Sequence, residues 1–260
     1  MSAPVLDFTG KSVVVTGGTK GVGRGITAAF LAAGADVVVC GRSPVEDLPT
    51  VDGRTAVFVQ ADVRDVEQVD RVVKTAVERF GKLDVLVNNA GGAPFTNAAT
   101  ASPRFHEKII ALNLTAPLNF MQRANVEMQK QADGGVIVNI ASVSGVRPSP
   151  GTAAYGAAKA GLISLTQSLA VEWAPKVRIN SIAASMILTE QAHLHYGDEE
   201  GVARVARTVP LGRLATPGDI ADVTLYLASS LSSYVTGANL LVHGGGERPA
   251  FLDAANAEHG

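Results

Sequence analysis

The sequence predicts an α/β fold, in which a doubly wound parallel sheet of about seven strands carries helices on both faces. Two observations predict it. Short apolar runs alternate along the chain with stretches of helical periodicity, which is the pattern of parallel strands and crossover helices. A glycine-rich turn joins the first apolar run to the first helical stretch. The 260 residues, 47% of them hydrophobic, can bury one substantial core, so we expect a single domain over residues 1–260.

Runs rich in valine and isoleucine predict buried strands. In chain order they are expected at Ser12–Thr16, Asp36–Cys40, Thr55–Gln60, Val85–Asn88, Val136–Ile140, Arg178–Ile182 and Leu240–His243. The helices are expected between the first two strands (ending at Gly34), at Val66–Phe80 (ending at Gly81), and at Ile109–Met128, Thr152–Trp173 and Asp219–Ala228.

Composition argues against several classes of protein. The net charge of −2, with both signs scattered, argues against a nucleic-acid surface. No apolar run is long enough for a membrane span, and Met1–Lys11 lacks the features of a secretory signal. Cys40 is the only cysteine, and His193 and His195 have no obvious third ligand, so we expect neither a disulfide nor a metal site. These features fit a cytoplasmic protein.

The glycine loop (residues 17–23) carries the pattern Gly17-x-x-x-Gly21-x-Gly23 between a strand and a helix. Glycines let the backbone turn sharply and approach a diphosphate at a helix N-terminus. The loop therefore predicts a dinucleotide site at the carboxyl ends of the strands. A glycine-rich turn with no ligand is the alternative.

Tyr155 and Lys159 are four residues apart in a stretch expected to be helical, so they share one face. A cation beside a phenol lowers the phenol pKa, which makes its proton easier to move. Ser142 ends a predicted strand upstream, and its hydroxyl could hold a carbonyl oxygen while the tyrosine delivers its proton.

With Thr16-Gly-Gly-Thr-Lys-Gly-Val-Gly23, Asn88-Asn-Ala-Gly91, Asn113, Ser142 and Tyr155-x-x-x-Lys159, the chain resembles the short-chain dehydrogenase/reductase family. The resemblance spans roughly Phe8 to Gly246 and implies a Rossmann-type fold, a nicotinamide dinucleotide and Tyr155 as general acid/base. It implies catalytic roles for Asn113, Ser142, Tyr155 and Lys159, with Asn113 holding a water. It implies cofactor contacts from Gly17, Thr19, Lys20, Gly21, Val22, Gly23, Arg42, Asp62, Val63, Asn89, Ala90, Gly91, Tyr155, Lys159, Ile187 and Thr189.

The chain departs from the family pattern at two places. Ala184-Ser185 replaces Pro-Gly after the sixth strand, which puts the path of the following loop in question. His243 replaces an aspartate near the end, where we expect a structural hydrogen bond. The resemblance also implies a substrate lid over residues 186–210, here called the lid segment. The tail, residues 247–260, is expected to be flexible or to fold over a neighbouring subunit.

We interpret the chain as an oxidoreductase that interconverts a ketone and a secondary alcohol. The alternatives are an enoyl reductase or isomerase on the same scaffold, or a catalytically silent dinucleotide-binding sensor or scaffold. Candidate pocket residues are mostly apolar and favour an acyl, alicyclic or steroid-like substrate: Ala93, Pro94, Phe95, Val143, Val146, Pro148, Met186 and Leu194.

The end of the second strand favours NADP(H) over NAD(H). Cys40 is followed by Gly41 and Arg42, so no carboxylate stands there to repel a 2′-phosphate, and Arg42 and Lys20 could pair with it. Small residues from Gly156 to Ser168 would let a second helix approach closely, and the resemblance implies a homotetramer or at least a dimer.

Overall fold

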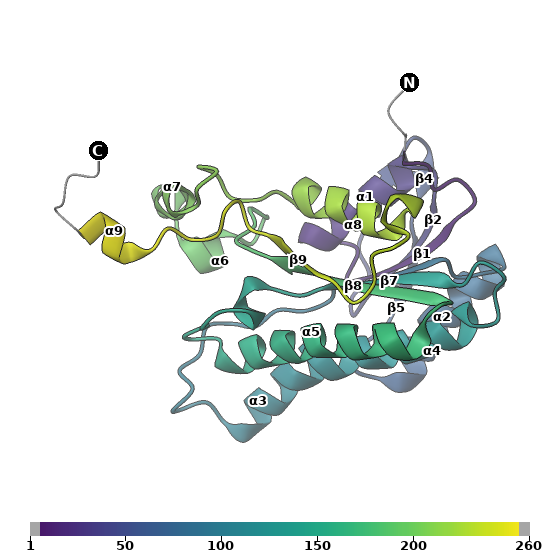
Figure 1. The fold of residues 1–260 in the computed structure, drawn as a ribbon, viewed down its shortest axis with the longest axis horizontal. Coiled ribbons are helices and arrows are strands. Elements are labelled where there is room, and N and C mark those ends of the chain that lie inside the picture. Colours follow the sequence, from purple (N-terminus) through teal and green to yellow (C-terminus); the bar gives the residue numbers. More distant parts are fainter. Residues whose placement is uncertain (1–5, 255–260) are drawn as a thin grey trace.

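A seven-stranded parallel sheet forms the centre of the computed structural model, which describes residues 6–254 (Figure 1). The strand order is β5-β2-β1-β6-β7-β8-β9. The strands are β1 (Ser12–Thr16), β2 (Asp36–Gly41), β5 (Val57–Gln60), β6 (Val85–Asn88), β7 (Gly135–Ile140), β8 (Val177–Ala184) and β9 (Asn239–Val242). The predicted doubly wound sheet is confirmed.

Strand β1 lies inside the sheet, between β2 and β6, and is buried along its whole length. Val13 pairs in parallel register with Val37 of β2 on one side and with Val85 of β6 on the other. The chain winds outward from β1 in both directions, so the order of strands reverses between β1 and β6. In open α/β sheets a ligand crevice forms at the carboxyl ends of the strands flanking such a reversal.

Helices cover both faces (Figure 1). They are α1 (Gly21–Ala32), α2 (Val66–Phe80), α3 (Pro103–Ile110), α4 (Ala116–Met128), α5 (Ala153–Trp173), α6 (His193–Tyr196), α7 (Glu199–Thr208), α8 (Pro217–Ala228) and α9 (Ala250–Ala254). The side chains of α2, α4 and α5 pack on one face of the sheet, and those of α1 and α8 pack on the other. Among the described residues, no helix is long and apolar enough to cross a membrane.

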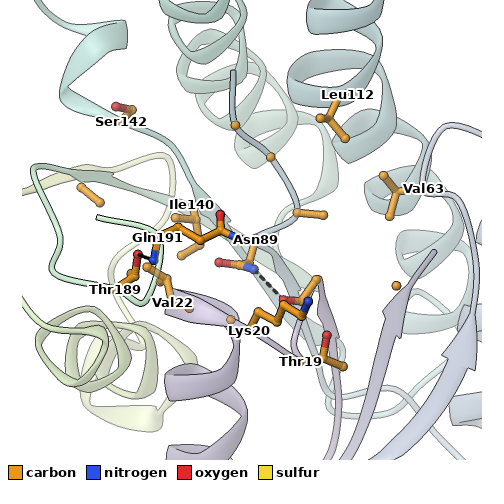
Figure 2. Close-up of a pocket in the computed structure, with 18 of the residues that line it drawn as sticks. Thr19, Lys20, Val22, Val63, Asn89, Leu112, Ile140, Ser142, Thr189 and Gln191 are labelled. Atoms are coloured by element: carbon orange, nitrogen blue, oxygen red, sulfur yellow. Dashed lines mark hydrogen bonds between the residues drawn. The ribbon is translucent and has the colours of Figure 1, made fainter. Parts of the chain in front are cut away.

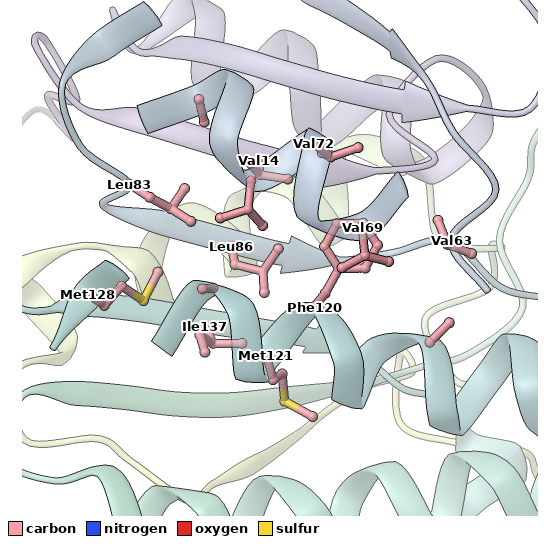
Figure 3. Packing of buried hydrophobic residues seen from close by; sticks show 14 of the residues in the cluster. Val14, Val63, Val69, Val72, Leu83, Leu86, Phe120, Met121, Met128 and Ile137 are labelled. Carbon is pink, nitrogen blue, oxygen red and sulfur yellow. The ribbon is translucent and has the colours of Figure 1, made fainter. Parts of the chain in front are cut away.

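The core under α2 and α4 shows how the pattern of apolar residues fixes this arrangement (Figure 3). Val69 and Val72 of α2 lie one helical turn apart and are fully buried, as are Phe120 and Met121 of α4. They pack against sheet residues such as Leu86. Full burial of one such side chain contributes roughly 1.5–3 kcal/mol, so this face holds both helices firmly on the sheet.

The predicted N-terminal end of the third strand, Thr55, was wrong. Thr55 belongs to a separate two-stranded hairpin, β3 (Thr50–Val51) and β4 (Arg54–Thr55), and β5 begins only at Val57. Asp52 and Gly53 form the turn, with φ of 49° and 75°. Two consecutive positive φ angles are what a tight hairpin turn requires, and Asp-Gly is a favoured pair for it.

The helix predicted over Ile109–Met128 begins earlier and is interrupted. Ser102 caps α3 by accepting a hydrogen bond from the amide of Phe105 at 3.2 Å, and Pro103 takes the first helical position. A π-helical turn, Ala111–Thr115, then separates α3 from α4. Asn113 lies in the middle of this turn.

The lid segment contains two short helices, α6 and α7. In the tail, α9 is the described element, and residues 255–260 lie outside the described part of the chain.

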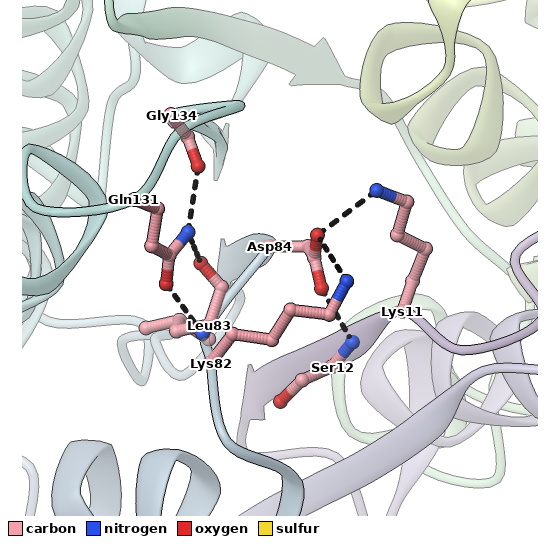
Figure 4. A network of polar contacts seen from close by, with 7 residues as sticks. All are labelled: Lys11, Ser12, Lys82, Leu83, Asp84, Gln131 and Gly134. Atoms are coloured by element: carbon pink, nitrogen blue, oxygen red, sulfur yellow. Dashed lines mark hydrogen bonds and ion pairs between the residues drawn. The ribbon is translucent and has the colours of Figure 1, made fainter.

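Asp84 joins the beginnings of the two central strands (Figure 4). Its carboxylate accepts a hydrogen bond from the amide of Ser12 at 2.9 Å and pairs with Lys11 at 3.0 Å and Lys82 at 3.1 Å. Nearby, the side-chain amide of Gln131 bonds both the amide and the carbonyl of Leu83. The two lysines are partly exposed and contribute little, so the buried bond to Ser12 is the stabilising contact.

Replacing Asp84 with alanine should destabilise the fold by about 1–3 kcal/mol, because the buried amide of Ser12 loses its partner. Urea unfolding followed by circular dichroism measures this as a lower midpoint. Glu127→Ala removes an exposed ion pair with Lys130 and is the control, with an expected change within about 0.5 kcal/mol. Equal midpoints for Asp84→Ala and the wild type would contradict this account of the junction.

Candidate active site

A cavity of about 560 Å³ lies at the carboxyl ends of the parallel strands, where the strand order reverses (Figure 2). Nearly all the residues singled out in the sequence line it: Gly17, Thr19, Lys20, Gly21, Val22, Gly23, Arg42, Asp62, Val63, Asn89, Ala90, Gly91, Ser142, Tyr155, Lys159, Ile187 and Thr189. Asn113 does not line the cavity and lies behind it. Segments far apart in the sequence thus meet at one site.

The glycine loop is shaped by close backbone contacts. Gly17 has a φ of 65°, which favours glycine. A Cβ atom at Gly23 would lie 2.3 Å from the carbonyl oxygen of Gly17 and 2.4 Å from Nδ2 of Asn89, so only glycine fits. The loop therefore packs directly on the end of β6 and brings the start of α1 to the cavity.

Tyr155 and Lys159 both project from the first turns of α5. Lys159 is almost fully buried, and its Nζ lies 5.7 Å from the centre of the Tyr155 ring. The same ammonium donates a hydrogen bond to the carbonyl of Ile140 at 2.7 Å, which fixes it against the end of β7. Ser142 follows that strand end and hydrogen-bonds the Tyr155 side chain. The hydroxyl, the phenol and the amine are therefore brought together.

The acid–base properties differ from the expectation for Tyr155. Burial raises the pKa of the phenol, and the hydrogen bond with Ser142 offsets this only in part. Burial also lowers the pKa of Lys159 to about 8. The expected lowering of the phenol pKa is therefore wrong for this structure, because the loss of hydration outweighs the hydrogen bond with Ser142. Tyr155 is a protonated acid at neutral pH.

Asn113 stabilises the loop after β6 without lining the cavity itself. Its Nδ2 donates hydrogen bonds to the carbonyls of Ile109 at 2.9 Å and Gly92 at 3.0 Å, and its Oδ1 accepts one from the Gly92 amide at 2.8 Å. A Cβ at Gly91 would lie 2.7 Å from Oδ1 of Asn113 and 3.3 Å from Nζ of Lys159. Asn113 thus ties the loop after β6 to the π-helical turn, next to Lys159.

The far end of the cavity is positively charged. Lys20 and Arg42 both line it. Asp62 also lies there, held by Arg64 through contacts of 2.9 Å from Nε and 2.5 Å from Nη2. These hydrogen bonds lower the pKa of Asp62 to about 2, so it stays ionised at neutral pH, with its charge balanced by Arg64.

Sequence reasoning missed three cavity residues with charged or amide side chains: Arg64, Glu190 and Gln191. Arg64 follows Asp62 by two positions, and Glu190 and Gln191 follow Thr189 directly. Their proximity to predicted site residues was the only signal in the sequence.

The departure at Ala184-Ser185 leaves the following loop well anchored. The amide of Ser185 donates to the carbonyl of Val242 at 3.1 Å. Further on, the amide of Leu188 bonds the carbonyl of Ala215 at 2.8 Å, and the amide of Ala215 bonds the carbonyl of Met186 at 3.1 Å. These backbone bonds keep Ile187 and Thr189 at the cavity. At His243, where a structural hydrogen bond was expected, the backbone carbonyl accepts a hydrogen bond from the amide of Gly246 at 3.0 Å.

The apolar candidates do not form one pocket. Ala93 and Pro94 lie in one small hollow, Met186 in another, and Val146 and Pro148 in an open groove beside α5. Phe95 and Leu194 are 79% and 68% exposed, whereas Val143 is buried. The expectation that these residues form one substrate pocket is therefore wrong for this structure, because the five that lie in hollows are divided among three separate ones.

The residues present fit a nicotinamide dinucleotide. One continuous cavity runs from the cations at Arg42 and Lys20 to the phenol of Tyr155. Gly21, the first residue of α1, also lines the cavity, so the start of this helix, where backbone amides can bind an anionic ligand, faces it. Asp62, Asn89 and the glycine loop would hold the adenosine and diphosphate parts, and the end near Tyr155 and Lys159 would hold the nicotinamide part.

Comparisons with known proteins agree with this geometry. The family model described as enoyl-(acyl carrier protein) reductase matches residues 17–247. L-rhamnose 1-dehydrogenase (NAD(P)(+)) from Azotobacter vinelandii is 36% identical over 245 residues, covering 90% of this chain and 96% of that protein. 3beta-hydroxysteroid dehydrogenase 1 from Eggerthella lenta is 38% identical over 246 residues, covering 92% and 94%.

A solved structure shares the whole fold. Ligand-free aldohexose dehydrogenase from Thermoplasma acidophilum matches with a TM-score of 0.87 at 27% identity, covering 99% of this chain and 100% of that one. Together with the family match over residues 17–247, these similarities show that the chain belongs to the short-chain dehydrogenase/reductase family of oxidoreductases.

Proposed function

We propose that the protein interconverts a ketone and a secondary alcohol, with Tyr155 as the general acid/base. The observation that carries the proposal is the meeting of Ser142, Tyr155 and Lys159 at one end of the cavity that the glycine loop lines at the other. A bound nicotinamide dinucleotide supplies or accepts the hydride. The chain's own residues handle the proton.

In reduction, the carbonyl oxygen gains negative charge as its carbon gains the hydride, and the phenol of Tyr155 donates a proton to that oxygen. The raised pKa of Tyr155 keeps this proton in place at neutral pH. The hydroxyl of Ser142 holds the same oxygen. Lys159, fixed on Ile140, stabilises the phenolate left after transfer. Oxidation of the alcohol runs through the same groups in reverse.

The description of the matching family model favours a second candidate, reduction of a carbon–carbon double bond. The Ser142 hydroxyl beside the phenol supports the first, since both groups can contact a single carbonyl oxygen. A silent sensor or scaffold would not need a buried lysine fixed beside the phenol. A panel of ketones and enoyl compounds, followed by absorbance of the reduced nicotinamide, separates the candidates.

The substrate class stays a proposal. By their names, the relatives act on a sugar and on a steroid. Ile140, whose carbonyl bonds Lys159, lines the cavity, and its apolar side chain supports an acyl, alicyclic or steroid-like ketone. The lid segment, residues 186–210, would cover such a substrate. We also propose that the protein acts in the cytoplasm.

Tyr155→Phe should reduce kcat by about 10²–10⁴-fold with little change in dinucleotide affinity, because the ring remains and the transferable proton is lost. Turnover of the best ketone in the panel and calorimetric titration with the cofactor measure the two effects. Tyr234→Phe removes a hydroxyl from a fully exposed side chain and is the control. Activity of Tyr155→Phe within tenfold of wild type would overturn the assignment.

We also propose a preference for NADP(H) over NAD(H). Arg42 and Lys20 line the cavity, and the charge of Asp62, which also lines it, is balanced by Arg64. A charge-assisted contact contributes roughly 1.5–3 kcal/mol, so kcat/KM should be at least about tenfold higher with NADPH. Arg42→Ala should remove most of the preference for NADPH. Arg79→Ala, at an exposed position of α2, should leave the preference unchanged. A wild type that favours NADH would contradict the proposal.

The proposed homotetramer or dimer would assemble through α5. Ala157, Ala160, Ser164 and Ser168 are exposed small residues on this helix, and Val171 beyond them is 82% exposed. Gly156 does not belong to this surface, because a Cβ there would lie 2.8 Å from the carbonyl oxygen of Ser144 in the same chain. Small exposed side chains let two copies of a helix approach closely in a symmetric contact.

Light scattering at micromolar concentration should give two or four times the mass of one chain. Ser164→Arg should shift the mass towards the monomer, since a long charged side chain separates the two helices. Glu78→Arg on the exposed face of α2 should not. A monomeric wild type would rule the assembly out.

A further inference from the structure

Glu190, near the start of the lid segment, contacts the first residue of α1. Its Oε1 accepts a hydrogen bond from the amide of Gly21 at 2.9 Å. Both residues line the large cavity. The contact therefore joins the lid segment to the glycine loop across 169 positions of sequence.

The turn around Glu190 rests on the glycine loop. A Cβ at Gly21 would lie 3.6 Å from Cγ2 of Thr189, so the Thr189 side chain lies beside the backbone of Gly21. The amide of Ala192 bonds the carbonyl of Thr189 at 3.0 Å, and the amide of Gln191 bonds the Thr189 hydroxyl at 3.3 Å. Figure 2 shows Thr189 close to Val22 of the loop, with the side chain of Gln191 directed towards Asn89.

The amide of Gly21 is one of the groups that a diphosphate would use. The first amides of a helix attract anions through their unpaired N–H groups and the helix dipole. A carboxylate bonded to such an amide gains the same stabilisation. Two anions cannot share the position without strong repulsion, so Glu190 and a diphosphate compete for it.

Glu190 is the carboxylate of the cavity that can compete with a diphosphate. Among the described residues lining the cavity, the acidic ones are Asp62 and Glu190. The charge of Asp62 is balanced by its two contacts with Arg64. The charge of Glu190 instead faces the glycine loop.

We propose that Glu190 acts as an internal competitor for the diphosphate position, so that a dinucleotide must displace it from Gly21 to bind. This lowers the affinity for the cofactor and couples its arrival to release of the lid segment from α1. The inference rests on the proposed function in that the competing ligand is a nicotinamide dinucleotide. It concerns binding, and its test does not depend on turnover.

The test is calorimetric titration of wild type and Glu190→Gln with NADP⁺, ADP and adenosine. Glutamine keeps the length and a neutral acceptor but loses the charge. NADP⁺ and ADP should bind the variant about five- to tenfold more tightly, since a neutral hydrogen bond is weaker than a charge-assisted one and the repulsion is gone. Adenosine lacks phosphate, so its affinity should not change. Glu199→Gln on α7, outside the cavity, is the matched control and should behave as wild type.

Equal or weaker binding of NADP⁺ by Glu190→Gln would overturn the inference, as would equal tightening by Glu199→Gln or of adenosine. If wild type binds NADP⁺ and turns over a ketone but Glu190→Gln binds it no better, this inference alone fails. If the predicted tightening appears but no carbonyl or alcohol is turned over, the proposed function fails and the competition stands. If the wild type binds no dinucleotide, both this inference and the proposed function are wrong.

Discussion

The junction between the ends of β1 and β6 is the contact on which the site depends. The hydroxyl of Thr16 accepts hydrogen bonds from the amides of Asn89 at 2.9 Å and Ala90 at 3.0 Å. The side chain of Asn89 donates in return to the carbonyls of Thr16 at 2.9 Å and Gly17 at 3.3 Å. These reciprocal bonds hold the glycine loop against the neighbouring strand end, and the close contact excludes any side chain at Gly23. The start of α1 and the loop after β6 therefore face one cavity.

A second set of buried polar contacts positions the reacting end. Nδ2 of Asn88 donates to Oδ1 of Asn139 at 2.8 Å, and Nδ2 of Asn139 donates to the hydroxyl of Thr166 on α5 at 2.9 Å. Lys159 lies about two helical turns before Thr166 on the same face of α5 and adds its bond to the carbonyl of Ile140. The helix that carries Tyr155 is thus tied to β6 and β7 by side chains whose polar atoms are costly to leave unpaired. This explains how the phenol can be placed reproducibly against Ser142.

Local sequence patterns were sufficient to predict the fold class and much of the candidate site. The doubly wound parallel sheet and the glycine loop followed from apolar runs and spaced motifs, and most residues of the cavity followed from the family resemblance that those motifs carry. The hairpin at Asp52-Gly53 and the start of α3 at Ser102-Pro103 also had local signals, which the strand and helix periodicities obscured. The contacts of Glu190 with Gly21 and of Lys159 with Ile140 could not be predicted, because they join segments whose approach depends on the packed fold. The raised pKa of Tyr155 was missed for the same reason, since burial is a property of the fold.

The central claim is that the chain moves a hydride to or from a carbonyl carbon while Tyr155 handles the proton. The most direct measurement uses reduced cofactor carrying deuterium at the hydride-bearing carbon of the nicotinamide ring, with a substrate containing both a ketone and a conjugated carbon–carbon double bond. Mass spectrometry and NMR of the product locate the label. The account predicts one deuterium on the carbon that bears the new hydroxyl group, with the double bond intact. Deuterium on a carbon of the former double bond, with the ketone intact, would contradict it.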